Sequence, residues 1–125
     1  MVMRFVIILA AIMLSKAAIA HEMVPAYLEL KSAPVDKVYM TTFKIFNRRN
    51  DVDYYAVSVY DEKWNQIPFA SFDRVFKVEH LKKKQVTVYI MEKDALSATY
   101  VCTASKLYSG KGAPVTSRIC SKIKR

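Results

Sequence analysis

The chain has 125 residues, of which 53% are hydrophobic, and its 20 Lys and Arg outnumber its 11 Asp and Glu to give a formal charge of +9. This length fits one domain, and two cysteines are too few for a disulfide-dense scaffold or for a zinc site of four thiolates. Two glycines are likewise too few for a phosphate-binding loop of the Walker or dinucleotide type.

Residues 1–20 have the pattern of a secretory signal peptide. A positive start ends at Arg4, an unbroken apolar run covers positions 5–14, and small residues at Ala18 and Ala20 form a cleavage site. The run is about half of the roughly 20 apolar residues that a membrane-spanning helix needs. We therefore expect a periplasmic or secreted domain over residues 21–125, without a transmembrane segment after processing. Loss of Arg4 and Lys16 would lower its formal charge to +7.

The remaining basic residues are spread along the chain, and their clusters lie at expected turns and at the chain end. These clusters contain no aromatic residues, whereas single-stranded nucleic acids are bound by surfaces that combine basic and aromatic side chains. We therefore expect no nucleic-acid partner, and weak attraction to an anionic membrane or an acidic protein stays open. The clusters are Arg48 and Arg49; Lys82, Lys83 and Lys84; and Lys122, Lys124 and Arg125.

From Val24 onward, apolar and polar residues often alternate, which predicts half-buried β-strands. Strands are expected at residues 26–30, 41–47, 55–60, 75–78, 85–90, 100–107 and 115–123, with one helical turn at 92–98. The alternation places residues on a common face of each strand: Thr41, Phe43 and Ile45; Tyr55, Val57 and Val59; and Val86, Val88 and Ile90. Short strands separated by turn-forming segments predict an all-β, immunoglobulin-like β-sandwich of about seven antiparallel strands.

The two cysteines are placed symmetrically about the only glycine-containing segment. Cys102 and Cys120 are equally far from Lys111 in Gly110-Lys111-Gly112. If this segment is a hairpin tip, the cysteines face each other on its two strands and can be bridged. We expect a structural disulfide that closes a loop of about 19 residues and contributes roughly 3 kcal/mol. A redox pair more often has a Cys-x-x-Cys spacing.

The sequence SATYVC at residues 97–102 resembles the F strand of immunoglobulin variable domains, including the Tyr-x-Cys of the tyrosine corner. The second immunoglobulin cysteine would lie on strand B, and residues 38–47 contain none. The resemblance therefore supports the sandwich fold and does not imply an immune function.

A wider resemblance includes TTFKIFN at residues 41–47, the strands at 55–60 and 76–90, and the last hairpin. Together these segments look like the N-terminal domain of periplasmic pilus-assembly chaperones. The resemblance implies a non-enzymatic, exported domain that binds a strand-incomplete protein subunit by β-strand addition. The chaperones' second domain has no counterpart in these residues.

In that family, the last strand lends hydrophobic side chains to the subunit, and two basic residues anchor the subunit's terminal carboxylate. The matching strand here supplies Val115, Ile119 and Ile123, separated by polar Ser117 and Ser121. Lys122 or Lys124 is the basic candidate on this strand, and no arginine marks the other position.

Charge on the last strand also suits a different role. Arg118, Lys122 and Lys124 would protect an exposed edge against aggregation. The alternative function is therefore a structural or adhesive accessory protein of the envelope or cell surface.

His21 suggests a third function. After cleavage it would offer an α-amine and an imidazole, and His80 could supply another nitrogen to a copper ion. A sandwich could bring both histidines to one end. The simpler interpretation is that His80 is a surface residue, and the neighbouring lysines disfavour a dication. We expect no other cofactor, and no pattern of catalytic residues is evident.

Overall fold

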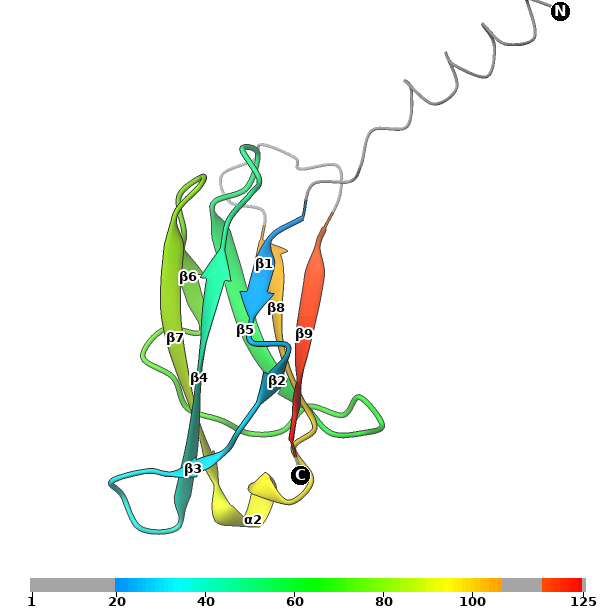
Figure 1. Cartoon of the computed structure of the whole chain (residues 1–125). Helices are drawn as coiled ribbons and strands as arrows, with labels where there is room; N and C mark the ends of the chain where they lie inside the picture. The colour runs from blue at the N-terminus through cyan, green and yellow to red at the C-terminus, as the bar shows by residue number, and fades with distance from the viewer. Residues whose placement is uncertain (1–19, 107–115, 125) are drawn as a thin grey trace, which may run out of the picture.

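The computed structural model describes residues 20–106 and 116–124, which form two packed β-sheets (Figure 1). The sheet that we name the β4 sheet contains β1 (Glu22–Val24), β3 (Lys31–Ser32), β4 (Val38–Phe46) and β7 (Lys83–Met91). The other, the β9 sheet, contains β2 (Tyr27–Leu28), β5 (Tyr54–Tyr60), β6 (Val75–Lys77), β8 (Tyr100–Lys106) and β9 (Arg118–Ile123). The predicted immunoglobulin-like fold is confirmed.

The expected helical turn is α2 (Glu92–Ala95), which follows β7. Within the described ranges, no helix is long and apolar enough to cross a membrane. The predicted signal peptide, apart from Ala20, lies outside the described residues, and so do Gly110-Lys111-Gly112 and Val115.

The first part of the chain crosses from one sheet to the other. β1 pairs antiparallel with β4, and after the cis Val24–Pro25 peptide bond, β2 pairs with β9. Proline cannot donate to a strand ladder, so Pro25 ends β1. The β2–β9 pairing is parallel, which differs from the wholly antiparallel prediction, and only Tyr27–Leu28 of the expected strand at 26–30 forms a strand, β2.

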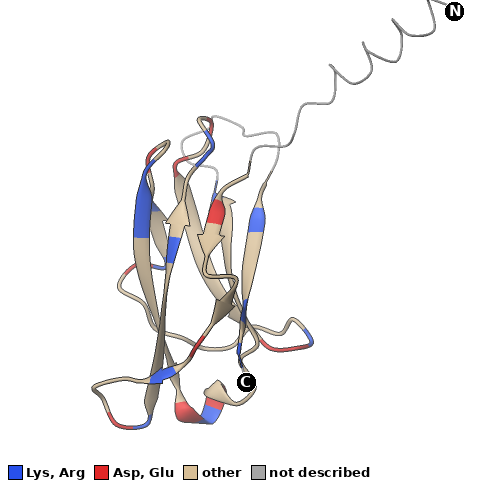
Figure 2. Ribbon diagram, in the orientation of Figure 1, with Lys and Arg blue, Asp and Glu red and all other residues tan. Residues whose placement is uncertain are grey.

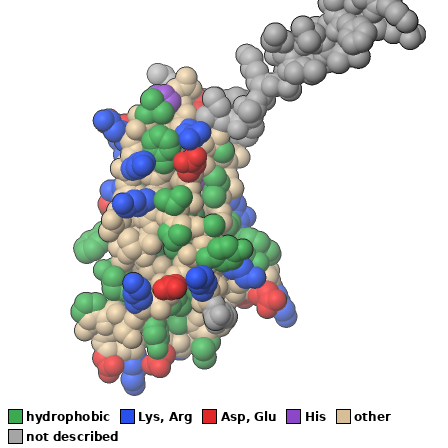
Figure 3. Space-filling view, in the orientation of Figure 1, with side chains coloured by type: hydrophobic (Ala, Val, Ile, Leu, Met, Phe, Trp, Pro, Cys, Tyr) green, Lys and Arg blue, Asp and Glu red, His purple; other side chains and the backbone are tan. Residues whose placement is uncertain are grey.

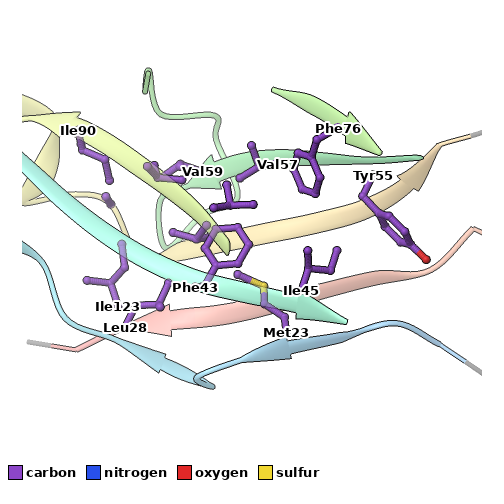
Figure 4. Close-up of a cluster of buried hydrophobic side chains, with 14 of the residues drawn as sticks. Met23, Leu28, Phe43, Ile45, Tyr55, Val57, Val59, Phe76, Ile90 and Ile123 are labelled. Carbon is purple, nitrogen blue, oxygen red and sulfur yellow. The ribbon is translucent and has the colours of Figure 1, made fainter. Parts of the chain in front are cut away.

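The core lies between the inward faces of β4, β5, β7, β8 and β9 (Figure 4). Alternation places Phe43 and Ile45 in the core, while Thr42, Lys44 and Phe46 face outward. The three faces that the alternation defines on β4, β5 and β7 are all buried. The β-branched and aromatic residues thus occupy the positions that the period of two assigns to them.

Lys83 and Lys84 lie in β7 and not in the turn where we expected them. They pair with Phe46 and Ile45 of β4. The β4–β7 ladder thus extends beyond the apolar part of β7. Charged side chains are tolerated at the end of an edge strand such as β7.

The last hairpin joins β8 to β9, with Cys102 directly opposite Cys120. The predicted disulfide is confirmed, and the two Cα atoms are 4.0 Å apart. Val101 and Thr103 of β8 are buried toward the core, so the bridge lies on the outer face of the β9 sheet.

An aromatic cluster covers part of this outer face. The Trp64 ring stacks on Tyr100 with 4.3 Å between their centroids. The Arg118 guanidinium lies 4.6 Å from the Tyr60 centroid and 5.0 Å from that of Trp64. One Arg118 nitrogen is 3.9 Å from the Cys102 sulfur. Arg118 therefore connects the disulfide to the aromatic cluster.

Candidate partner-binding site

One edge of β9 is only partly paired. β8 covers the other edge along almost the whole strand, whereas β2 has partners only for Lys122 and Ile123. The Lys122 amide donates to Ala26 (2.9 Å), and the Lys124 amide donates to Leu28 (2.7 Å). Amides two residues apart point the same way, so those of Arg118 and Cys120 face this edge too. In the part of the chain that the structure describes, no strand pairs with them there.

The apolar residues of β9 face this domain's own core. Ile123 is 3% exposed, and Ile119 is partly buried against the core. Ser121 lies on the same face and donates to the Pro25 carbonyl (2.6 Å). The structure therefore does not present Ile119 and Ile123 on the surface for a partner, because their period places them inside the sandwich.

A cleft of about 350 Å³ lies between β4 and residues 25–31, which we name the crossing segment because they lead from one sheet to the other. Lys31 of β3 and Lys124, the residue after β9, both line it. The Lys124 ammonium lies 3.8 Å from a Glu29 carboxylate oxygen, and both side chains are largely exposed. Tyr27, Leu28 and Met40 are among the apolar contributors. The cleft thus brings two cations from distant parts of the chain to a partly apolar surface.

The structure separates the two lysine candidates of the last strand. Lys124 lines the cleft, whereas Lys122 is exposed and pairs in register with Tyr27 and Tyr100. Sequence reasoning missed Lys31 because we sought an arginine on the first strand. The sequence signal that could have identified Lys31 is its position just before the turn that leads into β4.

At the other end of the sandwich, a buried polar cluster surrounds His21. Its ring nitrogens lie 2.9 Å from the Ser117 hydroxyl and 2.8 Å from the Thr103 hydroxyl. The His21 ring packs against Tyr55, with 4.6 Å between centroids. Burial lowers the pKa of His21 to about 4, hydrogen bonding to Thr103 opposes this shift, and the charge of Arg49 adds to it. His21 is therefore neutral near pH 7.

Arg49 joins this cluster to the loop after β4. Its side chain is 5% exposed and makes two hydrogen bonds to Asp51, at 2.6 and 2.9 Å. The same guanidinium lies 3.3 Å from the Ser105 hydroxyl and 3.4 Å from that of Ser117. This pairing raises the pKa of Arg49 and lowers that of Asp51. The carboxylate compensates a charge that burial would otherwise penalise.

The copper hypothesis needs a His21 nitrogen, and both ring nitrogens have hydroxyl partners. His80 is exposed in the turn between β6 and β7. The backbone carbonyl of Asn47 accepts a hydrogen bond from the Leu81 amide of this turn, and its side-chain carbonyl accepts one from the Tyr55 hydroxyl. Because the Tyr55 ring packs against His21, Asn47 links this turn to the His21 cluster. Over residues 20–106 and 116–124, no group of three or more His, Cys, Asp or Glu side chains is arranged to hold a metal.

Comparison with known proteins identifies the fold. No protein-family model matches the sequence, and no curated protein matches it. The structure is similar to that of the E. coli chaperone DraB, with a TM-score of 0.62 and 11% identity over 83% of this chain and 53% of DraB. The chain has a PapD-like fold.

A second similar structure is the ASH or PapD-like domain 7 of human CEP192. It has a TM-score of 0.50 and 8% identity, covering 82% of this chain and 81% of that one. The PapD-like chain spans about half the length of DraB. The resemblance to chaperone domains seen in the sequence is thus confirmed at the level of fold.

Proposed function

We propose that this chain is a PapD-like domain of the pilus-chaperone type that binds a strand-incomplete protein subunit in the periplasm. The open edge at Arg118 and Cys120 is the observation that carries the proposal. Unpaired backbone groups at such an edge can add a strand from another protein. This role needs no catalytic chemistry, so we expect a binding protein and not an enzyme.

The cleft supplies the second part of the proposal. We assign Lys31 and Lys124 as the two cations that hold the partner's terminal carboxylate. They line one cleft, which opens beside the end of β9. Glu29 offers Lys124 only an exposed carboxylate at 3.8 Å. Exposed pairs of this kind contribute about 0–1 kcal/mol, so an incoming carboxylate can replace Glu29 at little cost.

Capture from a periplasmic extract tests the proposal. The bait proteins are the wild type, a Lys31→Gln/Lys124→Gln variant and a matched Lys63→Gln/Lys93→Gln control whose changes lie on exposed residues elsewhere. We expect the wild type and the control to recover the same subunit, and the cleft variant to recover at least tenfold less.

Hydrogen exchange of the captured complex then tests the edge itself. The amides of Arg118 and Cys120 should become protected when the partner adds its strand. Recovery of no subunit, or a complex in which both amides exchange as in the free protein, would contradict the proposal. Recovery only as a self-assembled form would favour the structural accessory function.

A further inference from the structure

The turn between β6 and β7 forms a fixed tip at the end of the sandwich where β4 also ends (Figure 1). The Leu81 amide donates to the Asn47 carbonyl (2.7 Å), and the Asn47 amide donates to the Lys82 carbonyl (3.0 Å). The Lys82 amide also closes the turn onto Glu79 (3.0 Å). These bonds hold the tip against the loop that follows β4.

Leu81 is displayed at this tip and does not contribute to the core. Its side chain is 60% exposed, and its backbone has φ of 60°, a left-handed conformation that is uncommon for a residue other than glycine. Bonding to Asn47 maintains this conformation. The fold therefore stabilises a turn that exposes an apolar side chain.

Cations lie in the tip and on the strands next to it. Lys82, Lys83 and Lys44 are exposed, and none of them has a carboxylate within ion-pair distance among the described residues. Lys83 flanks the outward Phe46 ring at 5.6 Å from its centroid. Figure 2 marks basic positions on the parts of β4 and β7 nearest this end, and the space-filling view in Figure 3 shows basic side chains on the surface there.

Two of the nearby carboxylates pair with arginines and not with these lysines. Glu22 pairs with Arg48 and Asp51 pairs with Arg49. Glu79 is the acidic residue of the turn itself. The three lysines thus leave a net positive surface around Leu81.

We propose that this tip docks reversibly on an anionic lipid bilayer. Leu81 enters the interfacial region, and Lys44, Lys82 and Lys83 face the anionic headgroups. An apolar residue within a basic surface is the pattern by which proteins attach to such membranes. Leu81 stands exposed on a tight turn, so it can enter a fluid interface without needing a preformed pocket in a partner. The tip lies at the opposite end of the sandwich from the Lys31 and Lys124 cleft, so docking leaves that cleft free.

Vesicle co-sedimentation tests this docking. The full chain is mixed with phosphatidylcholine vesicles and with vesicles that also contain phosphatidylglycerol. We expect binding to the anionic vesicles alone, and loss of that binding in high salt. A Lys82→Gln/Lys83→Gln variant should bind about 30-fold more weakly, since each lysine near such a surface contributes about 1 kcal/mol.

Two further variants separate specific docking from net charge. Leu81→Ser should bind about tenfold more weakly, because it removes the apolar contact. The Lys63→Gln/Lys93→Gln control carries the same net charge as the tip variant and should bind like the wild type. Equal weakening in this control would overturn the proposal. Failure of the wild type to bind anionic vesicles would also overturn it, and retention on immobilised polyglutamate would then indicate an acidic protein as the partner.

Discussion

The buried imidazole of His21 makes a specific prediction about stability in mild acid. Its pKa in the folded protein is about 4, chiefly because burial disfavours the charged form. The Arg49 charge acts on it, the Tyr55 ring packs against it, and Asp51 pairs with Arg49. Burial raises the pKa of Tyr55 to about 12. In the unfolded chain, His21 should titrate near its ordinary pKa of 6.5.

The direction in which stability changes with pH follows from the number of protons that the folded and unfolded states bind. Between the two pKa values, the unfolded chain binds more protons at His21 than the folded protein, so stability falls as pH falls. The loss begins near 6.5 and is complete below about 4, where it reaches about 3 kcal/mol. Between about pH 7 and about pH 5, the loss from this residue amounts to about 2 kcal/mol.

Urea unfolding at these two pH values measures the effect, and a His21→Gln variant provides the reference. Glutamine can bond to Ser117 and Thr103 but does not titrate. The lowered pKa of Asp51 places its titration in more acidic solution, and the other groups are common to both proteins. The wild type should lose about 2 kcal/mol more than the variant from about pH 7 to about pH 5. An equal loss in both proteins would refute the reasoning.

Two further changes test what holds the loops and the last hairpin, both by urea unfolding. Cys102→Ser/Cys120→Ser should lower the free energy of unfolding by about 3 kcal/mol, and a double variant as stable as the parent would rule out a stabilising disulfide. Asn47→Ala should cost about 3 kcal/mol or more, because it leaves the buried groups at Val52, Val78 and Tyr55 without their side-chain partner. A cost below about 1 kcal/mol would show that the Asn47 amide does not hold these loops together.

Features that depend on local alternation could be predicted from the sequence. The inward residues of β4, β5 and β7 follow directly from the period of two. The disulfide followed from the position of the cysteines about one glycine-containing segment. The parallel β2–β9 pairing did not follow, because the crossing depends on Pro25 interrupting a strand that then finds a new partner in the other sheet.

The site residues were harder to predict because tertiary pairing brings them together. Lys31 and Lys124 line one cleft only when β3 lies beside β4 and the chain after β9 lies beside β2. His21 likewise reaches hydroxyls that are 82 and 96 residues away in sequence. No local period relates such positions. The sequence therefore predicted the sandwich and its disulfide, and the arrangement of charged groups at its two ends emerged from the structure.

The position of Trp64 determines what an optical probe of this protein detects. It is the only tryptophan of the chain, and it stacks on Tyr100 and lies beside Arg118 on the outer face of the β9 sheet. Its emission therefore reports on the environment of the disulfide hairpin and not on the packing between the sheets. Loss of core packing that left this hairpin intact would be silent in fluorescence while altering the near-ultraviolet circular dichroism of buried Tyr55. Disagreement between the two signals would thus reveal that the hairpin and the core unfold as separate cooperative units.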